Sequence, residues 1–347
     1  MSPQFVDFNA DGKLDIVAGT FSGSPYVAFG SAEGWKQPVE ILDRDQQRIL
    51  LNQFWNYDTK KWDTTKRCDP EGETPGEGHA TSAVAFDWDA DGDHDLLLGD
   101  HRSGRVFLRM NEGTAKEPRF ATRNQSVLAA GEPIDVPGTV ATIRLVDWNQ
   151  DGRTDLACGS MGDAYGQNEG GGVYVFLNTG TKQAPAFGAP LVLVERSKKS
   201  SGDGPTRPDS GLYMDFADHD GDGDLDLVVG GYSHWKPTPP VLSAAQQQRV
   251  KELQSEIEDL SKRLSAFYQE AQKATEGLEE AAAEKARSEA LARSATERKD
   301  LGQALQKAQK ELAPLAPGNQ RVSYVWLYEN RAKPAARQEP VPASGGR

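Results

Sequence analysis

Four aspartate-rich segments with one spacing recur along this chain, and binding of a divalent cation is the chemistry that they suit. Each segment, called here loops 1 to 4, has oxygen-bearing side chains at positions 1, 3, 5 and 9 and glycine at position 6. Those side chains are Asp7, Asn9, Asp11 and Asp15 in loop 1, Asp87, Asp89, Asp91 and Asp95 in loop 2, Asp147, Asn149, Asp151 and Asp155 in loop 3, and Asp218, Asp220, Asp222 and Asp226 in loop 4. Calcium takes roughly six to eight oxygen ligands, which alternate residues of a curled loop can supply. We therefore predict up to four Ca2+ sites.

Position 7 of each loop is predicted to bind the ion through its backbone carbonyl, so that the side chain there is unconstrained. The four residues at this position are Lys13, Asp93, Arg153 and Asp224. Glycine at position 6 permits a sharp turn that a side chain would obstruct.

The EF-hand begins with a similar loop, but it needs a bidentate glutamate at position 12 and a helix on either side. Position 12 is apolar or thiol-bearing in all four copies, where it is Ala18, Leu98, Cys158 and Val229. The EF-hand is therefore excluded. In each copy a short apolar run closed by glycine follows position 9, as in residues 96–99 (LLLG), and such runs are typical of buried strands.

The repeat extends beyond the loop to a third strand. Residues 106–114 and 173–181 share the pattern of an apolar run followed by Asn-x-Gly-Thr, and residues 26–29 and 324–330 are diverged copies. One unit therefore contains about four short strands, and the first residues of successive loops are 80, 60 and 71 positions apart. Repeated four-stranded units indicate the blades of a β-propeller.

The loops and the apolar, glycine-closed strands resemble the FG-GAP or VCBS repeats of integrin-type propellers. The resemblance covers the chain except residues 243–313 and about 40–80. It implies a propeller with calcium at the blade loops, usually extracellular, that serves adhesion or recognition. Members of that family commonly have seven blades, so the four evident here imply an open ring or part of a longer one.

The expected fold class is all-β, a β-propeller of four-stranded blades with an inserted antiparallel coiled-coil hairpin. We expect blade units at about 1–79, 80–139, 140–209 and 210–242, the hairpin at 243–313, a return strand at 314–331 that completes the fourth unit, and a disordered tail at 332–347. The first loop begins at residue 7, so we expect the chain to start inside a blade, with a truncated start.

The predicted hairpin rests on apolar residues spaced alternately by three and four, the pattern of a coiled-coil seam. They are Val250, Leu253, Ile257, Leu260, Leu264, Phe267, Ala271, Ala274 and Leu278, followed by a second seam at Leu301, Leu305, Ala308 and Leu312. Ser243 and Gln246 fit a capping box at the start. A single helix of this length would hold apart two strands that must pair, so the segment is expected to fold back near Gly277 into two arms of about 34 residues. A solvated spacer and a lever for dimerisation or docking are both consistent with this pattern.

Composition and charge narrow the function. The net charge of −13 argues against a nucleic-acid partner, and no run is long and apolar enough to span a membrane. Calcium on the order of millimolar, as found outside cells, fills weak loop sites that resting cytosolic calcium would leave empty. We therefore expect a secreted, cell-surface or periplasmic protein, although residues 1–5 are no signal peptide. Cys158 is expected in a buried strand rather than in a disulfide with Cys68.

Residues 54–62 carry an aromatic cluster outside the repeats, comprising Phe54, Trp55, Tyr57 and Trp62, with Cys68 and His79 following. Exposed aromatics can stack on sugars, but a hairpin more commonly buries its own aromatic side chains. No Gly-x-Ser-x-Gly or His-Glu-x-x-His motif is present in the sequence. The sequence thus favours a non-catalytic, calcium-binding recognition, adhesion or scaffold module with a protein or glycan ligand, followed by a lectin-like propeller and then by a propeller-borne polysaccharide lyase or hydrolase.

Overall fold

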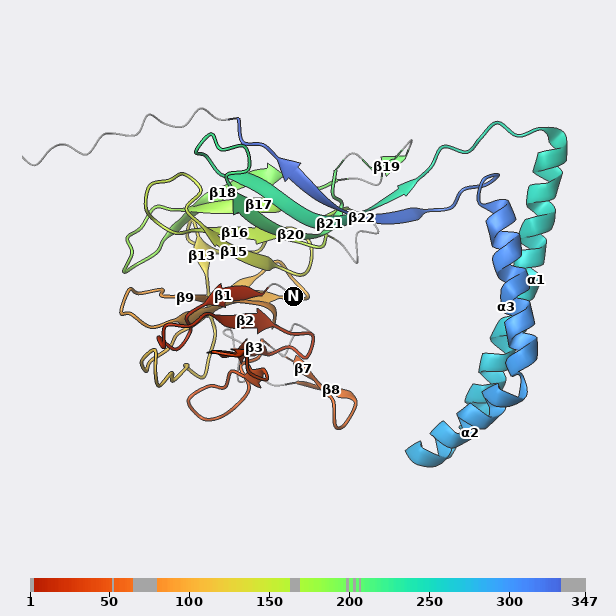
Figure 1. Ribbon diagram of the computed structural model, residues 1–347, viewed down its shortest axis with the longest axis horizontal. Coiled ribbons are helices and arrows are strands. Elements are labelled where there is room, and N and C mark those ends of the chain that lie inside the picture. The colour runs from red at the N-terminus through yellow and green to blue at the C-terminus, as the bar shows by residue number, and fades with distance from the viewer. Residues whose placement is uncertain are drawn as a thin grey trace, which may run out of the picture. The chain divides into compact units, whose positions relative to one another are not determined.

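The structure is a computed structural model of the chain, shown in Figure 1. It describes residues 3–51, 53–64, 80–162, 169–197, 200–201, 204–205 and 207–331. Cys68, His79 and the expected tail at 332–347 lie outside the described residues. The chain divides into two compact units, of which the first comprises Met1–Ser200, Pro205–His234 and Arg321–Arg347 and the second comprises Ser201–Gly204 and Trp235–Gln320.

The first two sheets each have four strands in an up-and-down order. The first sheet has the order β1-β2-β3-β6, with β1 at Gln4–Val6, β2 at Asp15–Gly19, β3 at Pro25–Ala28 and β6 at Val39–Glu40. The second has the order β12-β11-β10-β9, with β9 at Ala80–Phe86, β10 at Asp95–Asp100, β11 at Val106–Arg109 and β12 at Gln125–Ser126. Two short hairpins accompany them, β4 (Gly30–Ser31) with β5 (Gly34–Trp35) and β7 (Gln53–Asn56) with β8 (Lys61–Thr64).

The third and fourth sheets repeat the pattern with additions. The third has the order β14-β13-β18-β17-β16-β15, with β13 at Leu128–Ala129, β14 at Glu132–Pro133, β15 at Thr142–Val146, β16 at Asp155–Gly159, β17 at Val173–Asn178 and β18 at Phe187–Val194. In the fourth, β21 (Asp226–Lys236) pairs with β19 (Ser200–Ser201), β20 (Ser210–Ala217) and β22 (Gln320–Tyr328). In every sheet one of the acidic loops joins the first strand to the second, as between β15 and β16.

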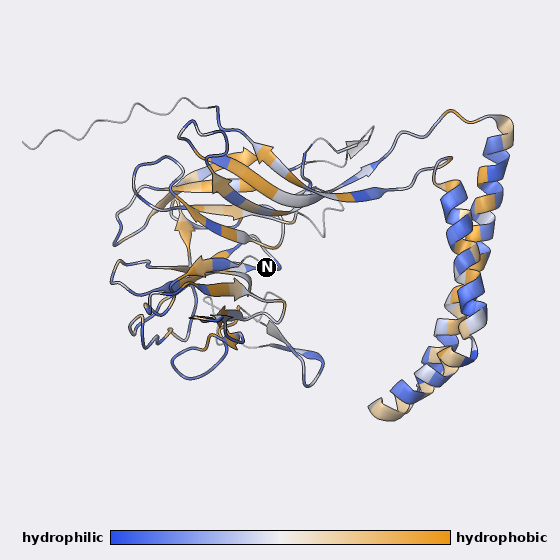
Figure 2. Cartoon of the chain, viewed as in Figure 1, coloured by the Kyte–Doolittle hydropathy of each residue, from blue (hydrophilic) through white to orange (hydrophobic). Residues whose placement is uncertain are grey.

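The sheets pack face to face in chain order. One core cluster joins the first two sheets through residues such as Val17 and Leu96, and another joins the second and third through Leu97 and Ile143. Strand β9 contacts β2 and β15, and β15 contacts β20. Figure 2 shows apolar residues concentrated in these strands. No strand pairing among the described residues joins the first sheet to the fourth, so the architecture is β-propeller-like without a closed ring being shown.

The glycines that close the apolar runs are explained by this packing. A Cβ at Gly99 would lie 2.1 Å from the carbonyl oxygen of Ala141, and one at Gly159 would lie 2.3 Å from that of Leu212. Each of these carbonyls belongs to the next sheet, so the glycine allows two neighbouring backbones to approach closely. Cys158, just before Gly159, is fully buried in β16, which confirms the expected buried strand, and burial raises the pKa of its thiol.

One segment departs from the expected organisation of the repeats. Strands β13 and β14 fall in the range assigned to the second unit, but they pair with the third sheet, where β13 runs parallel to β18. The reason is that β12 is only two residues long, after which the backbone N–H of Ala130 donates to the carbonyl of Phe187 at 2.8 Å. After the outer strand of the second sheet, the chain therefore continues as strands of the third sheet.

The second unit contains three helices, α1 (Ala244–Lys273), α2 (Glu280–Arg293) and α3 (Ala295–Leu312). The capping box at the start of α1 is confirmed, because Ser243 and Gln246 bond each other's backbone amides. Between α1 and α2 the chain turns through Gly277, whose φ of 76° suits glycine. The guanidinium of Arg249 donates to both carboxylate oxygens of Glu311 at 2.7 and 3.0 Å, which joins the start of α1 to the end of α3. The two helices therefore run antiparallel.

The second arm is broken rather than continuous. Helix α2 ends at Ser294, and α3 begins directly after it. The side chain of Arg298 stabilises the break by donating to the carbonyl of Leu291 at 2.8 Å and to the hydroxyl of Ser294 at 3.2 Å. Leu253, Leu260 and Ala271 of α1 and Leu301 and Ala308 of α3 are buried along the predicted seam, whereas Leu278 is 46% exposed. None of the described helices is long and apolar enough to cross a membrane.

Replacing Leu260 by alanine tests the packing of α1. Leu260 is 8% exposed, so truncation removes buried apolar contacts and should lower the stability of the helical unit by about 2 kcal/mol or more. We expect the helical circular-dichroism signal to melt at lower temperature. Lys262→Ala, on the exposed face of the same helix, should leave the melting temperature nearly unchanged, and equal effects of both variants would contradict the assigned seam.

Candidate metal centre

The four loops share one backbone conformation. Position 4 is left-handed in each, with φ of 53° at Ala10, 59° at Ala90, 56° at Gln150 and 79° at Gly221. Position 6 is also left-handed, with φ from 82° to 96° at the glycine of each loop, and a Cβ there would meet nothing within 4 Å. Glycine is therefore favoured at position 6 because of the positive φ there, and not because a side chain would be crowded. Two left-handed residues in a six-residue stretch curl the loop around its own first side chain.

The carboxylate at position 1 stabilises the turn by accepting hydrogen bonds from backbone amides of the loop. In loops 1, 2 and 3 its two oxygens accept hydrogen bonds from the backbone N–H groups of positions 5 and 6 at 2.9 to 3.2 Å. In loop 4 Asp218 accepts instead from Gly221 at 2.7 Å and from Gly223 at 3.1 Å. The amides that would otherwise be left without partners in the turn are satisfied by this one side chain.

The aspartate at position 9 connects the loop to the third strand of its sheet. Its Oδ2 accepts from the N–H of position 2, and its Oδ1 accepts from an N–H at or just beyond the end of the third strand. The Oδ2 bonds come from Phe8, Trp88, Trp148 and His219 at 2.9 to 3.0 Å, and the Oδ1 bonds come from Gly30, Asn111, Asn178 and Asn330 at 2.7 to 2.8 Å. All four aspartates are at most 1% exposed. Burial raises the pKa of Asp95 to about 6, although these amide bonds oppose the shift.

Carboxylates converge in two of the four loops. Those of Asp87, Asp89 and Asp91 in loop 2 offer oxygens within 4.8 Å of one another, and so do those of Asp218, Asp220 and Asp222 in loop 4. These are the acidic groupings of that size found among the described residues. The predicted ligands Asp95 and Asp226 lie outside both groupings, because their oxygens accept the amide bonds described above. The donor sets at positions 1, 3 and 5 fit a hard cation such as Ca2+.

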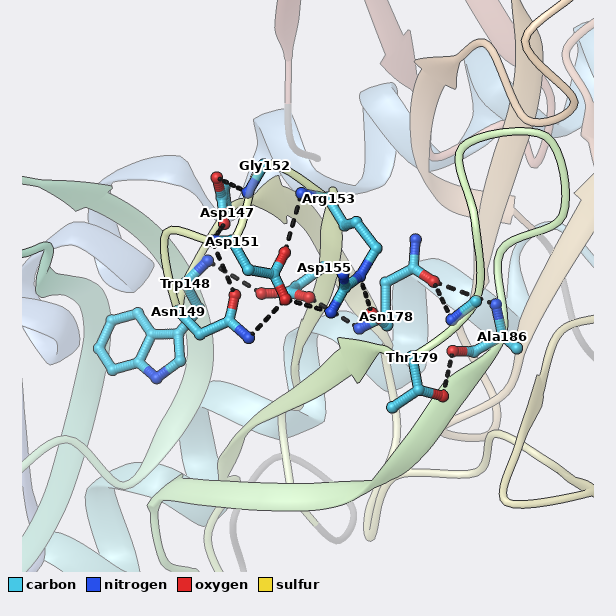
Figure 3. A network of polar contacts seen from close by, with 11 residues as sticks. Asp147, Trp148, Asn149, Asp151, Gly152, Arg153, Asp155, Asn178, Thr179 and Ala186 are labelled. Atoms are coloured by element: carbon cyan, nitrogen blue, oxygen red, sulfur yellow. Dashed lines mark hydrogen bonds and ion pairs between the residues drawn. The ribbon is translucent and has the colours of Figure 1, made fainter. Parts of the chain in front are cut away.

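Loops 1 and 3 have a different composition and different contacts. Position 3 is Asn9 or Asn149, and the basic side chain at position 7 forms an ion pair with the carboxylate at position 5. Lys13 Nζ lies 3.2 Å from Asp11 Oδ2, and Arg153 pairs with Asp151. Figure 3 shows Arg153 reaching across loop 3, where its Nε also donates to the carbonyl of Asn178 at 2.6 Å. In these loops the position-5 carboxylate is thus paired with a basic side chain of the same loop.

The side chain at position 7 is buried in loops 2 and 4. Asp93 is 4% exposed and Asp224 is 6% exposed. Burial, followed by the charges of Asp91, Asp89 and Asp87, raises the pKa of Asp93 to about 6. The pKa of Asp224 is raised for the same kinds of reason. From the sequence we expected no constraint on the side chain at position 7. Position 7 is nevertheless basic in loops 1 and 3 and acidic in loops 2 and 4, and this difference separates the two pairs of loops.

Neighbouring loops lie next to one another along one edge of the sheets. His94 of loop 2 stacks on Phe8 of loop 1 with ring centroids 6.2 Å apart, and Gln150 of loop 3 donates to the carbonyl of Gly223 in loop 4 at 2.6 Å. Residues of loops 2 and 3, together with Lys182, line a cavity of about 230 Å³. The charges of the four loops are therefore gathered into one row.

Two asparagines at the ends of third strands also stabilise the loops, although we did not expect a functional role for them from the sequence. Asn111 Oδ1 accepts from the N–H of Gly113 at 3.0 Å and of Arg119 at 2.8 Å, and Asn178 Oδ1 accepts equivalent bonds from Gly180 and Ala186. The backbone N–H groups of the same asparagines hold the position-9 aspartates. The repeated Asn-x-Gly that follows the third strand was the signal for this role.

Comparison with known protein families agrees with the geometry. The sequence model of the FG-GAP-like repeat matches residues 87–158 and 147–229, which contain loops 2, 3 and 4 and the strands between them. The chain therefore contains FG-GAP-like repeats, and the predicted resemblance is confirmed. No curated protein and no solved structure matched the chain.

The substitution Asp95→Asn, studied in the presence of a chelator, tests whether the aspartate at position 9 stabilises the fold through its two amide bonds. An amide has a single acceptor oxygen, so one of the two buried N–H groups, of Trp88 or of Asn111, loses its partner. Hydrogen bonds to charged groups are worth about 1.5 to 3 kcal/mol, and we expect the free energy of unfolding to fall by about that amount in urea denaturation at pH 8. Asp89→Asn, in the same loop, should leave it unchanged or raised because it relieves repulsion within the triad; a larger loss for Asp89→Asn would refute the assignment.

The raised pKa of Asp93 predicts a pH dependence of the metal-free protein. Its pKa rises from the ordinary 3.8 to about 6, so the neutral form is favoured by folding. That contribution to stability is full below pH 3.8 and is lost as the pH rises through 6. In the presence of a chelator, Asp93→Asn should therefore reduce the decline in unfolding free energy between pH 4 and pH 6. The exposed Asp58→Asn serves as the control, and an undiminished decline in Asp93→Asn would count against the shift.

Proposed function

We propose that this chain is a non-catalytic, calcium-binding module for recognition, adhesion or scaffolding that acts outside the cytoplasm. FG-GAP-like repeats suggest an adhesion or recognition module, and the acidic groupings are compatible with a bound cation. The single observation that carries the calcium proposal is the convergence of three carboxylates in loops 2 and 4, each within a turn whose backbone amides are held by the aspartates at positions 1 and 9. A preformed turn presents its oxygens without a large ordering cost.

The proposed role of calcium is to stabilise the row of loops. Carboxylates held within 4.8 Å of one another repel, and a divalent cation between them converts that repulsion into attraction. Calcium on the order of millimolar outside cells is sufficient for loop sites of weak affinity. This is the reason for proposing a secreted, cell-surface or periplasmic location.

The proposed ligand is a protein or a glycan that contacts the outer surface of the repeats. The carboxylates at positions 1 and 9 accept hydrogen bonds from loop amides, which supports a structural role for them and is the argument for a non-catalytic module. A polysaccharide lyase or hydrolase activity is the competing proposal. Turnover of polysaccharides by the purified chain would support that competitor.

A glycan ligand is favoured by one specific observation. Trp55 and Trp62 face each other across the β7–β8 hairpin with ring centroids 5.5 Å apart, and Phe21 lies 6.0 Å from Trp62. The hairpin buries its aromatics only in part, since Trp55 is half-buried whereas Tyr57 and Trp62 are 67% and 38% exposed, and the neighbouring Phe21 is 54% exposed. Exposed aromatic faces of this kind can stack on sugar rings. Loss of glycan-array binding in Trp62→Ala would support a lectin-like role.

The helical unit is proposed to be a coiled-coil hairpin that mediates dimerisation or docking. Its support is the antiparallel contact of α1 and α3 through the buried seam residues. The alanine-rich helix α2 is the segment proposed to receive a further helix.

Calcium should raise the melting temperature of the protein through preferential binding to the folded state. At a calcium concentration about 100 times the dissociation constant, one site contributes about 2.7 kcal/mol. For a protein of this size that corresponds to a shift of roughly 3 to 5 °C in differential scanning fluorimetry with calcium against chelator.

Asp91→Ala should reduce this calcium-induced shift, because it removes one carboxylate of the loop 2 triad. The readout is the difference between the two conditions, since Asp91 also accepts a bond from the N–H of Asp93 and its loss lowers the melting temperature without metal. Asp58→Asn is the control. A calcium shift that is absent in the unmodified chain would overturn the proposed calcium binding.

A further inference from the structure

Contacts between successive sheets use the same positions of the repeat each time. In the second sheet, Val106 and Leu108 lie five and three residues before Asn111, and they are 1% and 4% exposed in the core cluster shared with the third sheet. In the third sheet, Val173 and Val175 hold these positions, and both are 0% exposed. We call the face that carries these residues, and that packs against the next sheet in chain order, the forward face of a sheet.

The opposite face of each sheet, its rear face, packs against the preceding sheet. The residue directly after loop position 9 lies on it, and Leu96, Leu156 and Leu227 are 0%, 0% and 2% exposed there. Each of them belongs to a core cluster that includes residues of the preceding sheet. The contacts between successive sheets of this chain therefore join a forward face to a rear face.

The forward face of the fourth sheet has apolar residues at the same positions, but they are exposed. Val325 and Leu327 lie five and three residues before Asn330, and they are 75% and 40% exposed. Tyr328, the next residue of β22, packs against the core cluster of the third and fourth sheets. Since successive side chains of a strand point to opposite faces, Val325 and Leu327 face away from the third sheet.

Gly230 lies on the same exposed face. Gly99 and Gly159 hold the corresponding position in the second and third sheets, where a Cβ would lie 2.1 or 2.3 Å from a carbonyl oxygen of the next sheet. A Cβ at Gly230 would meet only the carbonyl oxygen of Tyr213, in its own sheet, at 3.7 Å among the described atoms. The small residue that admits a neighbouring backbone is thus present where no described sheet lies against it.

The rear face of the first sheet is exposed as well. Val6 and Val17 pack towards the second sheet, whereas Phe5 and Ile16, which pair directly across β1 and β2, point to the other side. Phe5 is 57% exposed, and its ring lies 5.8 Å from that of Trp35, which is 53% exposed. Ile16 is only half-buried, although the corresponding residue of every later sheet is at most 2% exposed. Figure 1 shows β1 and β2 apart from β21 and β22.

We propose that this chain associates with a second copy of itself, through the forward face of the fourth sheet in one protomer and the rear face of the first sheet in its partner. The occupant is a second copy because these two faces are the two halves of an interface that the chain already forms between its own sheets. The reciprocal contact closes a two-fold ring of eight sheets, four from each copy. Propellers have about four to eight blades, and a ring of three copies would exceed that range.

The repeat also specifies which side chains meet across this contact. Within the chain, Val173 shares a core cluster with Leu227, and Phe216 packs against the cluster that contains Val175. The corresponding pairs between copies are Val325 with Ile16 of the partner and Leu327 with Phe5 of the partner. This association depends neither on the helical unit nor on calcium, and it goes beyond the function proposed above.

The mass of the full chain, measured by light scattering after size exclusion, tests the association, and we expect twice the chain mass of 37.8 kDa. Val325→Asp and Phe5→Asp each place an unpaired charge in both contacts, and each should weaken the dimer at least about a hundredfold. Both residues are more than half exposed in the single chain, so both variants should fold, as circular dichroism would verify. Val241→Asp is the matched control at a fully exposed valine outside both faces, and it should remain dimeric.

Mixing the two weakened variants distinguishes this head-to-tail contact from a symmetric one. A mixed dimer of Val325→Asp with Phe5→Asp has both substitutions in one contact and none in the other. We therefore expect the mixture to recover a dimer that neither variant forms alone. A symmetric pairing of β22 with β22 would be lost in Val325→Asp, unaffected in Phe5→Asp and not restored by mixing, and this result would overturn the inference.

Ala282→Asp, on the exposed surface of α2, separates this association from dimerisation through the helical unit, and it should leave the dimer intact. Loss of the dimer in Ala282→Asp but not in Val325→Asp would overturn the inference. A monomeric unmodified chain, or an open series of species larger than a dimer, would overturn it as well. None of these results bears on calcium binding, which is measured separately by the calcium-induced shift in melting temperature.

Discussion

The interaction on which this architecture depends is a buried aspartate that accepts one backbone hydrogen bond from its own loop and another from the end of the third strand of its sheet. At position 9 of each loop, one carboxylate oxygen takes the amide of position 2 and the other takes an amide at or just beyond the end of the third strand. A single side chain thereby fixes both the loop and the register of three strands. The same contact closes the fourth sheet across 104 residues, where Asn330 returns to Asp226. A helical unit can be inserted between two adjacent strands because this contact specifies where the returning strand belongs.

Satisfying backbone amides with carboxylates has an electrostatic consequence. Each loop gathers aspartates that its turn needs as acceptors, and neighbouring loops bring those charges into one row. The chain balances the charge internally where position 7 is a base, as at Lys13 and Arg153. Where position 7 is a buried aspartate, as at Asp93 and Asp224, the side chain adds to the negative charge of its loop instead.

The row exists because the sheets pack closely in sequence order. Gly99 and Gly159 let a carbonyl of the next sheet approach to a distance that no side chain would permit. That close approach places loop 2 beside loop 3 and loop 3 beside loop 4, as the bond from Gln150 to Gly223 shows. The sheets bury most of their apolar residues in the contacts between them, so the acidic loops remain at the edge of the packed sheets.

The sequence by itself determined the repeat, the strand that follows each loop, the capping box at Ser243 and the buried environment of Cys158. These features depend on local spacing and hydrophobic pattern, which are written directly in the chain. The tertiary structure alone decided three matters. It assigned β13 and β14 to the third sheet, because pairing depends on which edge is free.

It also broke the second helical arm at Ser294, where a side chain from the next turn satisfies the open carbonyl of Leu291. Finally, it separated the position-9 aspartates from the triads and buried Asp93 and Asp224, because a carboxylate is committed only when folding brings an amide or another charge to it. The loop spacing identified every acidic residue of the candidate site. Which of them accept an amide from the third strand depended on strands that are distant in the sequence.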